Sequence, residues 1–328
     1  MHHVHTMAYA NKTPWHGLGN RLAPNQPLET WARSAGMDWR IQESEVRFVT
    51  GDNADVSDPG TVHAFPHQKV LYRSDTKAPL SVVSQRYQVV QPGEILEFYR
   101  DLTEVGGFEL ESAGVLKEGR KFWALARTGQ SATLKGKDQV NGYLLLATAC
   151  DGTLATVAQF TSIRVVCNNT LAIALGQGQG AVKVPHRSQF DAQAVKRQLG
   201  VAVSSWDNFM TRMKALSERK VSPQQAEAFF KRVLTYNTTG GIDPTDHPVT
   251  TVNDRALKAV QALYAGSGKG AELSSAAGTA WGLVNGVTEY IDHHRRARSD
   301  DHRRDAAWFG AGAVLKQRAW EEANKLIA

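Results

Sequence analysis

The apolar and polar positions divide the chain into a part with the period of strands and a part with the period of helices. Between residues 38 and 167, apolar residues alternate with polar ones in several short runs, as in a half-buried strand. From residue 189 onward, apolar residues recur every three or four positions, as in an amphipathic helix. The pattern therefore predicts an α+β core domain with an N-terminal arm over residues 1–175 and a mainly helical domain over residues 185–328.

The clearest strand signals lie between residues 108 and 175 and predict consecutive β-hairpins. Three runs are predicted strands: residues 108–116, 121–127 and 142–150. The pair Asp151-Gly152 is a strong signal for a two-residue hairpin turn, and a long strand follows it. We expect the run Asn168-Asn169-Thr170 to end this strand and to cap a short helix. The predicted fold is α+β, with an antiparallel β-hairpin sheet backed by a helix and followed by a mostly helical C-terminal part.

Further elements are predicted on either side of these hairpins. Strands are expected at residues 38–49 and within 63–76, and one helix between Pro92 and Gly106. In the C-terminal part, Ser222 and Pro223 suit the N-cap and the first position of a helix. The predicted helices of that part cover residues 189–217, 222–234, 253–265, 279–297 and 305–327, and residues 235–248 are predicted to be a loop.

Composition narrows the class of protein. The chain has 328 residues, of which 42% are hydrophobic and 21% charged, so it can bury a core without disulfides or structural metals. The two cysteines, Cys150 and Cys167, favour a reducing, cytoplasmic setting, and we expect neither a secretory signal nor a membrane span. The formal net charge of +6 and the pI of about 9.3 favour a polyanionic partner.

Several glycine-rich or histidine-rich motifs have structural interpretations. The sequences PWHGLG, GQGQG and GSGKG, which begin at residues 14, 176 and 266, lack the spacing of a dinucleotide or Walker phosphate loop. We interpret PWHGLG as a structural plug, and GSGKG as a linker in preference to a phosphate cradle built on Lys269. His2, His3 and His5 are interpreted as a solvated tail, and Cys167 as a buried hydrophobe rather than a nucleophile.

The run Asp292-His293-His294 is the remaining candidate for metal chemistry. It resembles the metal-binding motifs of certain phosphoesterases, but it lies late on a predicted helix and no second acidic-histidine cluster accompanies it. We therefore expect no catalytic residue, no metal and no cofactor.

Basic residues of the hairpins suit a grip on phosphates. Arg164 shares a strand face with Ser162 and Asn168, so we expect it on the surface that the predicted helix leaves open. The expected nucleic-acid contacts are Lys117, Arg120, Lys121, Arg127, Lys135, Lys137 and Arg164, with Arg295, Arg296 and Arg298 as a second patch. Either Phe122 or Trp123, whichever faces outward, is expected to stack on bases.

Three stretches together resemble a known family. They are PWHGLG from residue 14, FTSIRVVCNNTL from residue 160 and TAWGLVNGVTEYIDHHR from residue 279. They are similar to a family of phage- and plasmid-encoded proteins classed as a domain of unknown function (DUF932-type). The resemblance implies a mobile-element gene and a bacterial cytoplasm, and it assigns no catalytic residues. In architecture alone, hairpins followed by a helix and flanked by basic loops also resemble single-strand annealing proteins, which assemble as rings or filaments.

Three functions remain open at this point. The leading expectation is a non-enzymatic, annealing-type protein of a phage or plasmid that binds single-stranded DNA in recombination, replication or repair and forms a homo-oligomer. The alternative is a protein-interaction module that targets a host defence factor. The third is a metal-dependent phosphoesterase that uses Asp292, His293 and His294. Salt-dependent DNA binding, capture of a host protein and metal content distinguish the three.

Overall fold

The computed structural model describes residues 7–10, 19–51, 60–104, 107–166, 169–172, 181–200, 203–242 and 248–328. The chain forms two compact units, and each unit is assembled from separate segments. Unit 1 comprises residues 1–128, 144–159 and 181–199, and unit 2 comprises residues 129–143, 160–180 and 200–328. Residues 160–175, which end the predicted hairpin region, therefore lie in unit 2 together with the C-terminal helices. The predicted domains, 1–175 and 185–328, stay a prediction, because a compact unit is no test of independent folding.

The main sheet has eight strands in the order β10-β9-β8-β7-β6-β1-β2, with β11 paired to β9. The strands are β1 (Met7–Ala10), β2 (Asn20–Leu22), β6 (Glu109–Leu116), β7 (Lys121–Leu134), β8 (Asp138–Ala149), β9 (Thr156–Arg164), β10 (Asn169–Ala172) and β11 (Val182–Val184). A short 3-10 turn, Lys117–Gly119, joins β6 to β7, which pair antiparallel. The antiparallel sheet and the helical C-terminal region confirm the predicted α+β class.

The segment after β9 is a strand and not the predicted helix. β10 pairs antiparallel with β9, with Asn169 opposite Arg164 and Ala172 opposite Thr161. Runs of Asn and Thr favour turns as well as helix caps, and here the edge of β9 offers β10 its backbone partners. In unit 2, helices α8 (Ala280–Glu289) and α10 (Ala311–Asn324) contact β10, so helices do cover this strand. Cys167 and Asn168 lie outside the described residues.

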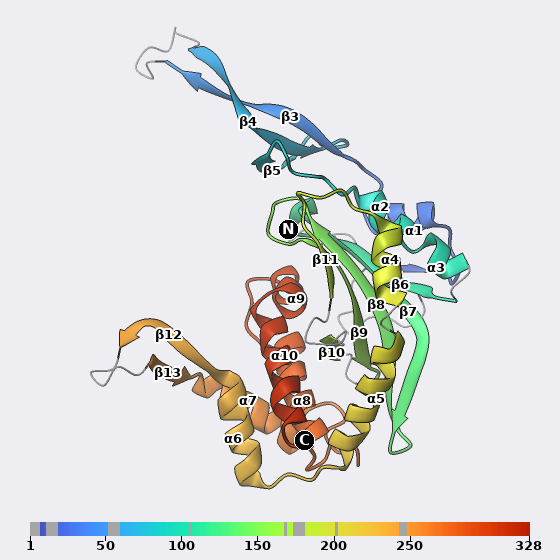
Figure 1. Ribbon diagram of the computed structural model, residues 1–328, viewed down its shortest axis with the longest axis vertical. Coiled ribbons are helices and arrows are strands. Elements are labelled where there is room, and N and C mark those ends of the chain that lie inside the picture. The colour runs from blue at the N-terminus through green and yellow to red at the C-terminus, as the bar shows by residue number, and fades with distance from the viewer. Residues whose placement is uncertain are drawn as a thin grey trace. The chain divides into compact units, whose positions relative to one another are not determined.

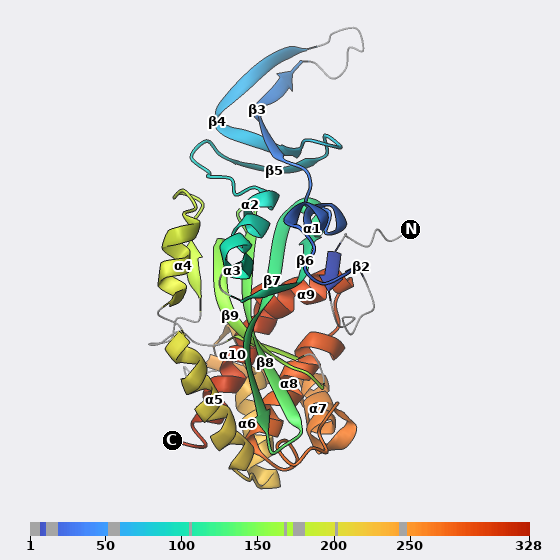
Figure 2. The ribbon, with the colours of Figure 1, turned by 90° about the vertical axis from the view of Figure 1, so that its right-hand side faces the viewer.

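In unit 1, short helices pack on the main sheet. They are α1 (Leu28–Ser34), α2 (Pro92–Glu97), α3 (Arg100–Glu104) and α4 (Ala192–Gly200). The single helix predicted from Pro92 is two helices, because the chain turns at Phe98 and Tyr99, which are both buried. The Tyr99 hydroxyl lies 2.9 Å from the carbonyl oxygens of Ala124 in β7 and Leu144 in β8. This contact anchors α2 and α3 to the sheet. Figure 2 shows these two helices beside β6, β7 and β9.

A second sheet of unit 1 contains β3 (Ile41–Thr50), β4 (Thr61–Arg73) and β5 (Pro79–Ser84) in the order β3-β4-β5. It confirms the strands predicted at 38–49 and within 63–76. Because β5 pairs only with the second half of β4, the far ends of β3 and β4 continue as a two-stranded ribbon (Figure 1).

Helices form most of unit 2. Besides α8 and α10 they are α5 (Val203–Glu218), α6 (Pro223–Leu234), α7 (Asp254–Ala262) and α9 (Asp300–Phe309), with π-helical turns at Leu263–Ser267 and Tyr290–His294. Ser222 caps α6 by accepting a hydrogen bond from the Gln225 amide, as predicted. The helix predicted at 305–327 is instead two helices that meet at Gly310. The predicted loop at 235–248 contains β12 (Thr235–Ile242) and the start of β13 (Pro248–Val252), which pair with each other.

α8 is the central helix of unit 2, because every one of its residues is buried. Among the helices that the structure describes, none is long and apolar enough to cross a bilayer.

Candidate nucleic-acid interface

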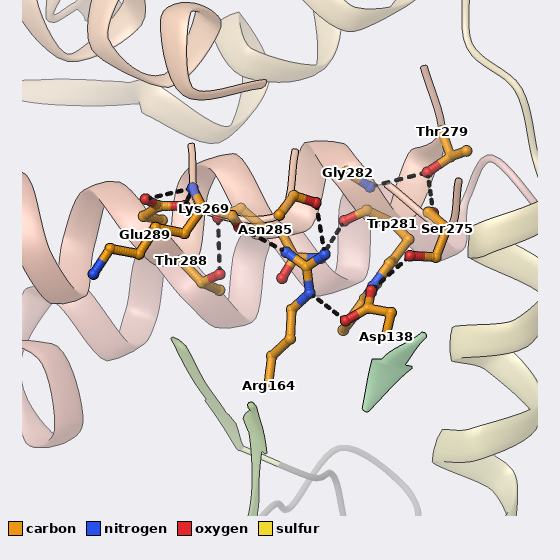
Figure 3. A network of polar contacts seen from close by, with 11 residues as sticks. Asp138, Arg164, Lys269, Ser275, Thr279, Trp281, Gly282, Asn285, Thr288 and Glu289 are labelled. Carbon is orange, nitrogen blue, oxygen red and sulfur yellow. Dashed lines mark hydrogen bonds and ion pairs between the residues drawn. The ribbon is translucent and has the colours of Figure 1, made fainter. Parts of the chain in front are cut away.

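Arg164 lies at the end of β9, and its side chain is buried inside unit 2. It is 3% exposed, and its Nε atom donates to Asp138 Oδ1 at 2.7 Å (Figure 3). Its other nitrogens donate to the carbonyl oxygens of Lys269 at 3.3 Å and Gly270 at 2.9 Å. Internal acceptors therefore surround the guanidinium. The structure contradicts the prediction that Arg164 contacts phosphate.

Asp138 is the acceptor at the centre of this network. It is the first residue of β8 and is 1% exposed. Its Oδ2 atom accepts hydrogen bonds from Ser275 Oγ at 2.6 Å and from Trp281 Nε1 at 3.1 Å. A buried carboxylate is tolerated when a cation and further donors satisfy it, and Asp138 has both. The network ties the ends of β8 and β9 to α8 and to the loop that precedes it (Figure 3).

Glu289, at the end of α8, holds the glycine-rich loop that contains Lys269. Both oxygens of its buried carboxylate accept hydrogen bonds from the Lys269 backbone amide, at 3.0 and 3.1 Å. The loop makes its turns at Gly266 and Gly270, whose φ angles are 141° and 71°. The GSGKG segment is therefore packed against the end of α8 and is not a linker. The anionic group that binds the Lys269 amide is the Glu289 carboxylate and not a phosphate.

The space beside Arg164 and Glu289 is too small for a phosphate group. A cavity of about 10 Å³ lies between them, lined also by Tyr264, Lys269 and Asn285. This volume holds about one water molecule. The network is therefore a structural core, and any ligand of unit 2 has to bind outside it.

Three more predicted contacts are buried. Lys121 is 4% exposed, Phe122 0% and Trp123 2%. They lie in β7, which has β6 on one side and β8 on the other, and residues 121–126 are buried on both faces of the sheet. Phe122 packs edge to face on Trp39, with ring centroids 5.5 Å apart. Because β7 lacks an outward face here, the structure contradicts Lys121 as a phosphate contact and both aromatic residues as base-stacking platforms.

The other predicted cations of unit 1 are partly exposed, and two of them face carboxylates. Arg120 lies 3.4 Å from Glu118, and Arg127 lies 2.9 Å from Glu111. Lys117 is half-buried in the turn between β6 and β7. These ion pairs offset part of the positive charge that the sequence placed on this hairpin.

Lys135 and Lys137 are exposed at the turn between β7 and β8, in unit 2. The φ angles of Lys135 and Gly136 are 44° and 79°, and two successive residues with positive φ are the mark of a type I′ hairpin turn. The next residue, Asp138, is fixed in the buried network. The two lysines therefore project from a turn whose base is rigid.

The second predicted patch, which follows the π-helical turn Tyr290–His294, is partly exposed. Arg296 and Arg298 are exposed, whereas Arg295 is half-buried and its carbonyl oxygen accepts from Arg303 Nε at 3.2 Å. Arg303 also donates to Asp300 at 3.1 Å. Arg296 and Arg298 therefore stay candidates for phosphate contact, whereas the half-burial of Arg295 makes it the less accessible of the three.

The candidate metal motif does not converge on a metal position. Asp292 is buried and accepts a hydrogen bond from Lys316 Nζ at 2.8 Å. His294 Nε2 lies 3.8 Å from Glu289, on the network described above. Within the described ranges, no three His, Cys, Asp or Glu residues are grouped so that they could hold a metal ion. Lys316 supplies the positive charge that a metal would otherwise bring to Asp292.

The net positive charge of the chain lies almost entirely in unit 2. Unit 2 contains 20 lysines and arginines and 15 aspartates and glutamates, whereas unit 1 contains 18 and 17. A cavity of about 440 Å³ in unit 1 does not change this balance, because three glutamates, Glu29, Glu104 and Glu109, line it together with Arg100. Charge therefore favours unit 2 as the part of the chain that meets a polyanion.

Comparison with known proteins gives one match. A family model described as "Domain of unknown function (DUF932)" matches residues 79–308, which include β5 to β13 and α2 to α8. No curated protein and no solved structure matches the chain significantly.

Proposed function

We propose that this chain, which belongs to the family described as Domain of unknown function (DUF932), is a non-enzymatic protein that binds single-stranded DNA. In this proposal it is an annealing-type protein of a phage or plasmid and acts in recombination, replication or repair in the bacterial cytoplasm. Unit 2 holds the strand through its phosphates.

The observation that carries the proposal is the concentration of positive charge in unit 2 around a rigid frame. Lys137 directly precedes Asp138, and the Lys269 carbonyl accepts from Arg164, so both lysines adjoin atoms of one buried network. Lys135, Lys137 and Lys269 are exposed. Exposed lysines on a fixed backbone suit a phosphate chain, because they supply point charges without reading base edges.

This form of binding fits annealing. A protein that holds phosphates leaves the bases free to pair with a second strand. Each phosphate contact on a single strand adds about −0.7 to the slope of log affinity against log salt concentration. Because Phe122 and Trp123 are buried, base stacking at these residues forms no part of the proposal.

Charge reversal at the β7–β8 turn tests the assignment of the site. We expect K135E/K137E to weaken the binding of a labelled single-stranded oligonucleotide in fluorescence anisotropy. Because one or two phosphate contacts are lost, the slope of log affinity against log salt concentration is expected to become shallower by about 0.7 to 1.4. The matched control is K183E/R187E, which makes the same charge change at two exposed residues of unit 1. Equal losses in the two variants would mean that net charge, and not this turn, determines binding.

A second candidate function rests on a different surface. Phe48, Val49, Val62 and Phe65 are large apolar residues that are exposed on the ribbon of β3 and β4. Exposed apolar patches mark protein interfaces, which favours the host-factor alternative. That function predicts a specific host partner on pull-down and no salt-dependent DNA binding.

A further inference from the structure

The far half of the β3–β4 ribbon is apolar on both of its faces. We call residues 46–50 and 61–65 the distal ribbon. In its register, Val46 lies opposite Phe65 and Phe48 opposite His63, while Val49 lies opposite Val62. Opposite residues of an antiparallel pair share a face, so the first two pairs form one face and the third belongs to the other.

These apolar side chains are exposed to an unusual degree. Phe48 is 48% exposed, Phe65 41%, Val49 62% and Val62 58%. A two-stranded ribbon is marginally stable in water unless another element covers it. The distal ribbon therefore has the composition of a buried element without a cover among the described residues of its own unit.

Charge argues against a nucleic acid as that cover. Between residues 46 and 67 the sequence contains one arginine, Arg47, and three aspartates, Asp52, Asp55 and Asp58. A ribbon that binds DNA needs cations, because phosphate contacts supply most of the affinity. The partner of the distal ribbon is therefore a protein surface.

The free backbone edge of the distal ribbon lies on β3. In the described residues β3 pairs with β4 alone, so its outer edge presents unpaired N–H and C=O groups. β5 pairs with β4 from Gln68 onward, so it does not reach the distal ribbon. Pro66 lies at the register irregularity between the two halves of β4, and proline has no N–H to donate to a further strand. β3 is thus the edge that is suited to accept another strand.

We propose that β3 pairs antiparallel with β3 of a second copy of this chain, about a twofold axis at Val46. The pairing widens the two-stranded ribbon to four strands and gives its apolar side chains neighbours along each face, although it does not cover the faces. In this register Val46 faces Val46 of the partner subunit. Glu45 faces Arg47 of the partner subunit, and Arg47 faces Glu45 of the partner subunit. Within one chain, Arg47 Nη2 donates to Glu45 Oε2 at 3.0 Å, and the two side chains are 66% and 67% exposed. In the dimer they exchange this pair for the equivalent pair across the axis.

The register is set by charge complementarity. A twofold axis repeats every contact, so one opposite-charge pair on the edge becomes two. An axis shifted to Arg47 would instead place two like charges together, which is destabilising. The proposal goes beyond DNA binding and does not rest on it, because the pairing is measured without nucleic acid.

The test is a charge swap read out by sedimentation equilibrium over a range of protein concentrations. The wild type is expected to dimerise as concentration rises. E45R and R47E each convert two attractive pairs into repulsive ones and are expected to raise the dimer Kd about tenfold. The double variant E45R/R47E restores both pairs and is expected to return the Kd to near the wild-type value.

A cysteine pair tests the axis itself. V46C in a C150S/C167S background places two thiols opposite each other in the dimer and is expected to form a disulfide-linked dimer under mild oxidation. S44C, whose counterpart would be Phe48 of the partner subunit, is expected to remain unlinked. A wild type that is monomeric at every concentration, or a double variant as weak as the single ones, would overturn the proposal.

Discussion

Arg164 Nε lies 2.7 Å from Asp138 Oδ1, and both side chains are buried in unit 2. This ion pair explains why an arginine interrupts an apolar strand: it neutralises a carboxylate that also accepts from Ser275 and Trp281. The pair fixes the base of the turn that carries Lys135 and Lys137. In the proposed function, Arg164 is therefore a positioning residue and the lysines are the contacts.

Removing one member of the pair is expected to destabilise the protein strongly. R164M leaves Asp138 charged and buried without its cation, which costs about 3–5 kcal/mol of unfolding free energy. The double variant R164M/D138L removes both charges and is expected to cost less than the sum of the two single changes. Urea denaturation followed by circular dichroism measures each value.

R296M is the matched control, because Arg296 is exposed. It is expected to change the unfolding free energy by less than about 0.5 kcal/mol. If R164M were as mild as R296M, the pair would not be a structural core.

The loop that carries Lys269 is expected to be sensitive to substitution at Gly270. Its φ of 71° is strained for other residues, and an added Cβ would lie 2.8 Å from Val166 Cγ1 and 3.1 Å from Arg164 Nη2. G270A is therefore expected to cost about 2–4 kcal/mol, since overpacking adds to backbone strain. Thermal and urea unfolding measure this loss.

Substitutions at Gly136 and Gly93 separate backbone strain from overpacking as causes of the loss in G270A. Gly136 has a φ of 79° and open space around it, so G136A is expected to show the backbone strain alone, about 1–2 kcal/mol. Gly93 also has open space and lies in α2 with an ordinary φ, so G93A is expected to be neutral or slightly stabilising. A loss for G270A no larger than that for G136A would contradict close packing against Arg164.

Cys150 is expected to be unreactive in the folded protein. Its thiol is buried, and burial raises its pKa from 9.0 to about 12. In a C167S background, a maleimide or iodoacetamide reagent at pH 8 is expected to label Cys150 only as the protein unfolds. Rapid labelling of the folded protein would contradict the burial.

The same shift predicts a loss of stability in alkaline solution. Above pH 9 the unfolded chain releases the Cys150 proton while the folded chain retains it, so folding is increasingly opposed as pH rises. The contribution is about 1.4 kcal/mol per pH unit between pH 9 and 12. Comparing C167S with C150A/C167S measures the contribution of Cys150 together with its effect on the neighbouring Tyr87, whose pKa is raised mainly by burial and further by the charge of Cys150. The raised pKa of Tyr99, which burial causes, acts equally in both variants. Parallel pH profiles of the two variants would argue against the shift.

Local signals predicted much of the fold. Ser222 and Pro223 marked the start of α6, because capping depends on residues that are neighbours in the chain. The pair Asp151-Gly152 marked the connection of β8 to β9, although residues 150–155 form a turn longer than two residues. The family resemblance was also confirmed, since the family model covers two of the three quoted stretches in full.

The candidate site was harder to predict, because its contacts are not local. Asp138 carries no motif, and its partners Ser275 and Trp281 lie 137 and 143 positions away. The sequence offers one signal, a lone acid shortly before the apolar strand predicted at residues 142–150, and this signal does not say whether the acid is buried. β10 was predicted as a helix because its partner, the edge of β9, is visible only once the sheet is assembled.

The burial of β7 shows a second limit of predicting structure from the alternation of apolar and polar residues. Alternation in residues 121–127 correctly predicted a strand, but it implied one solvated face. Lys121 is nevertheless buried, as is every residue from 121 to 126, and one of the covering side chains is Trp39, which lies 82 or more positions before them in the chain.

The most direct test of the central claim is fluorescence anisotropy of a labelled single-stranded oligonucleotide at two salt concentrations, with the matching duplex as control. If unit 2 holds a strand by its phosphates, the protein binds the single strand more tightly than the duplex, and its affinity falls as salt rises because the release of counterions becomes less favourable. Absence of binding at the lower salt concentration, or binding that salt does not weaken, would contradict the claim that unit 2 holds a nucleic-acid strand by its phosphates.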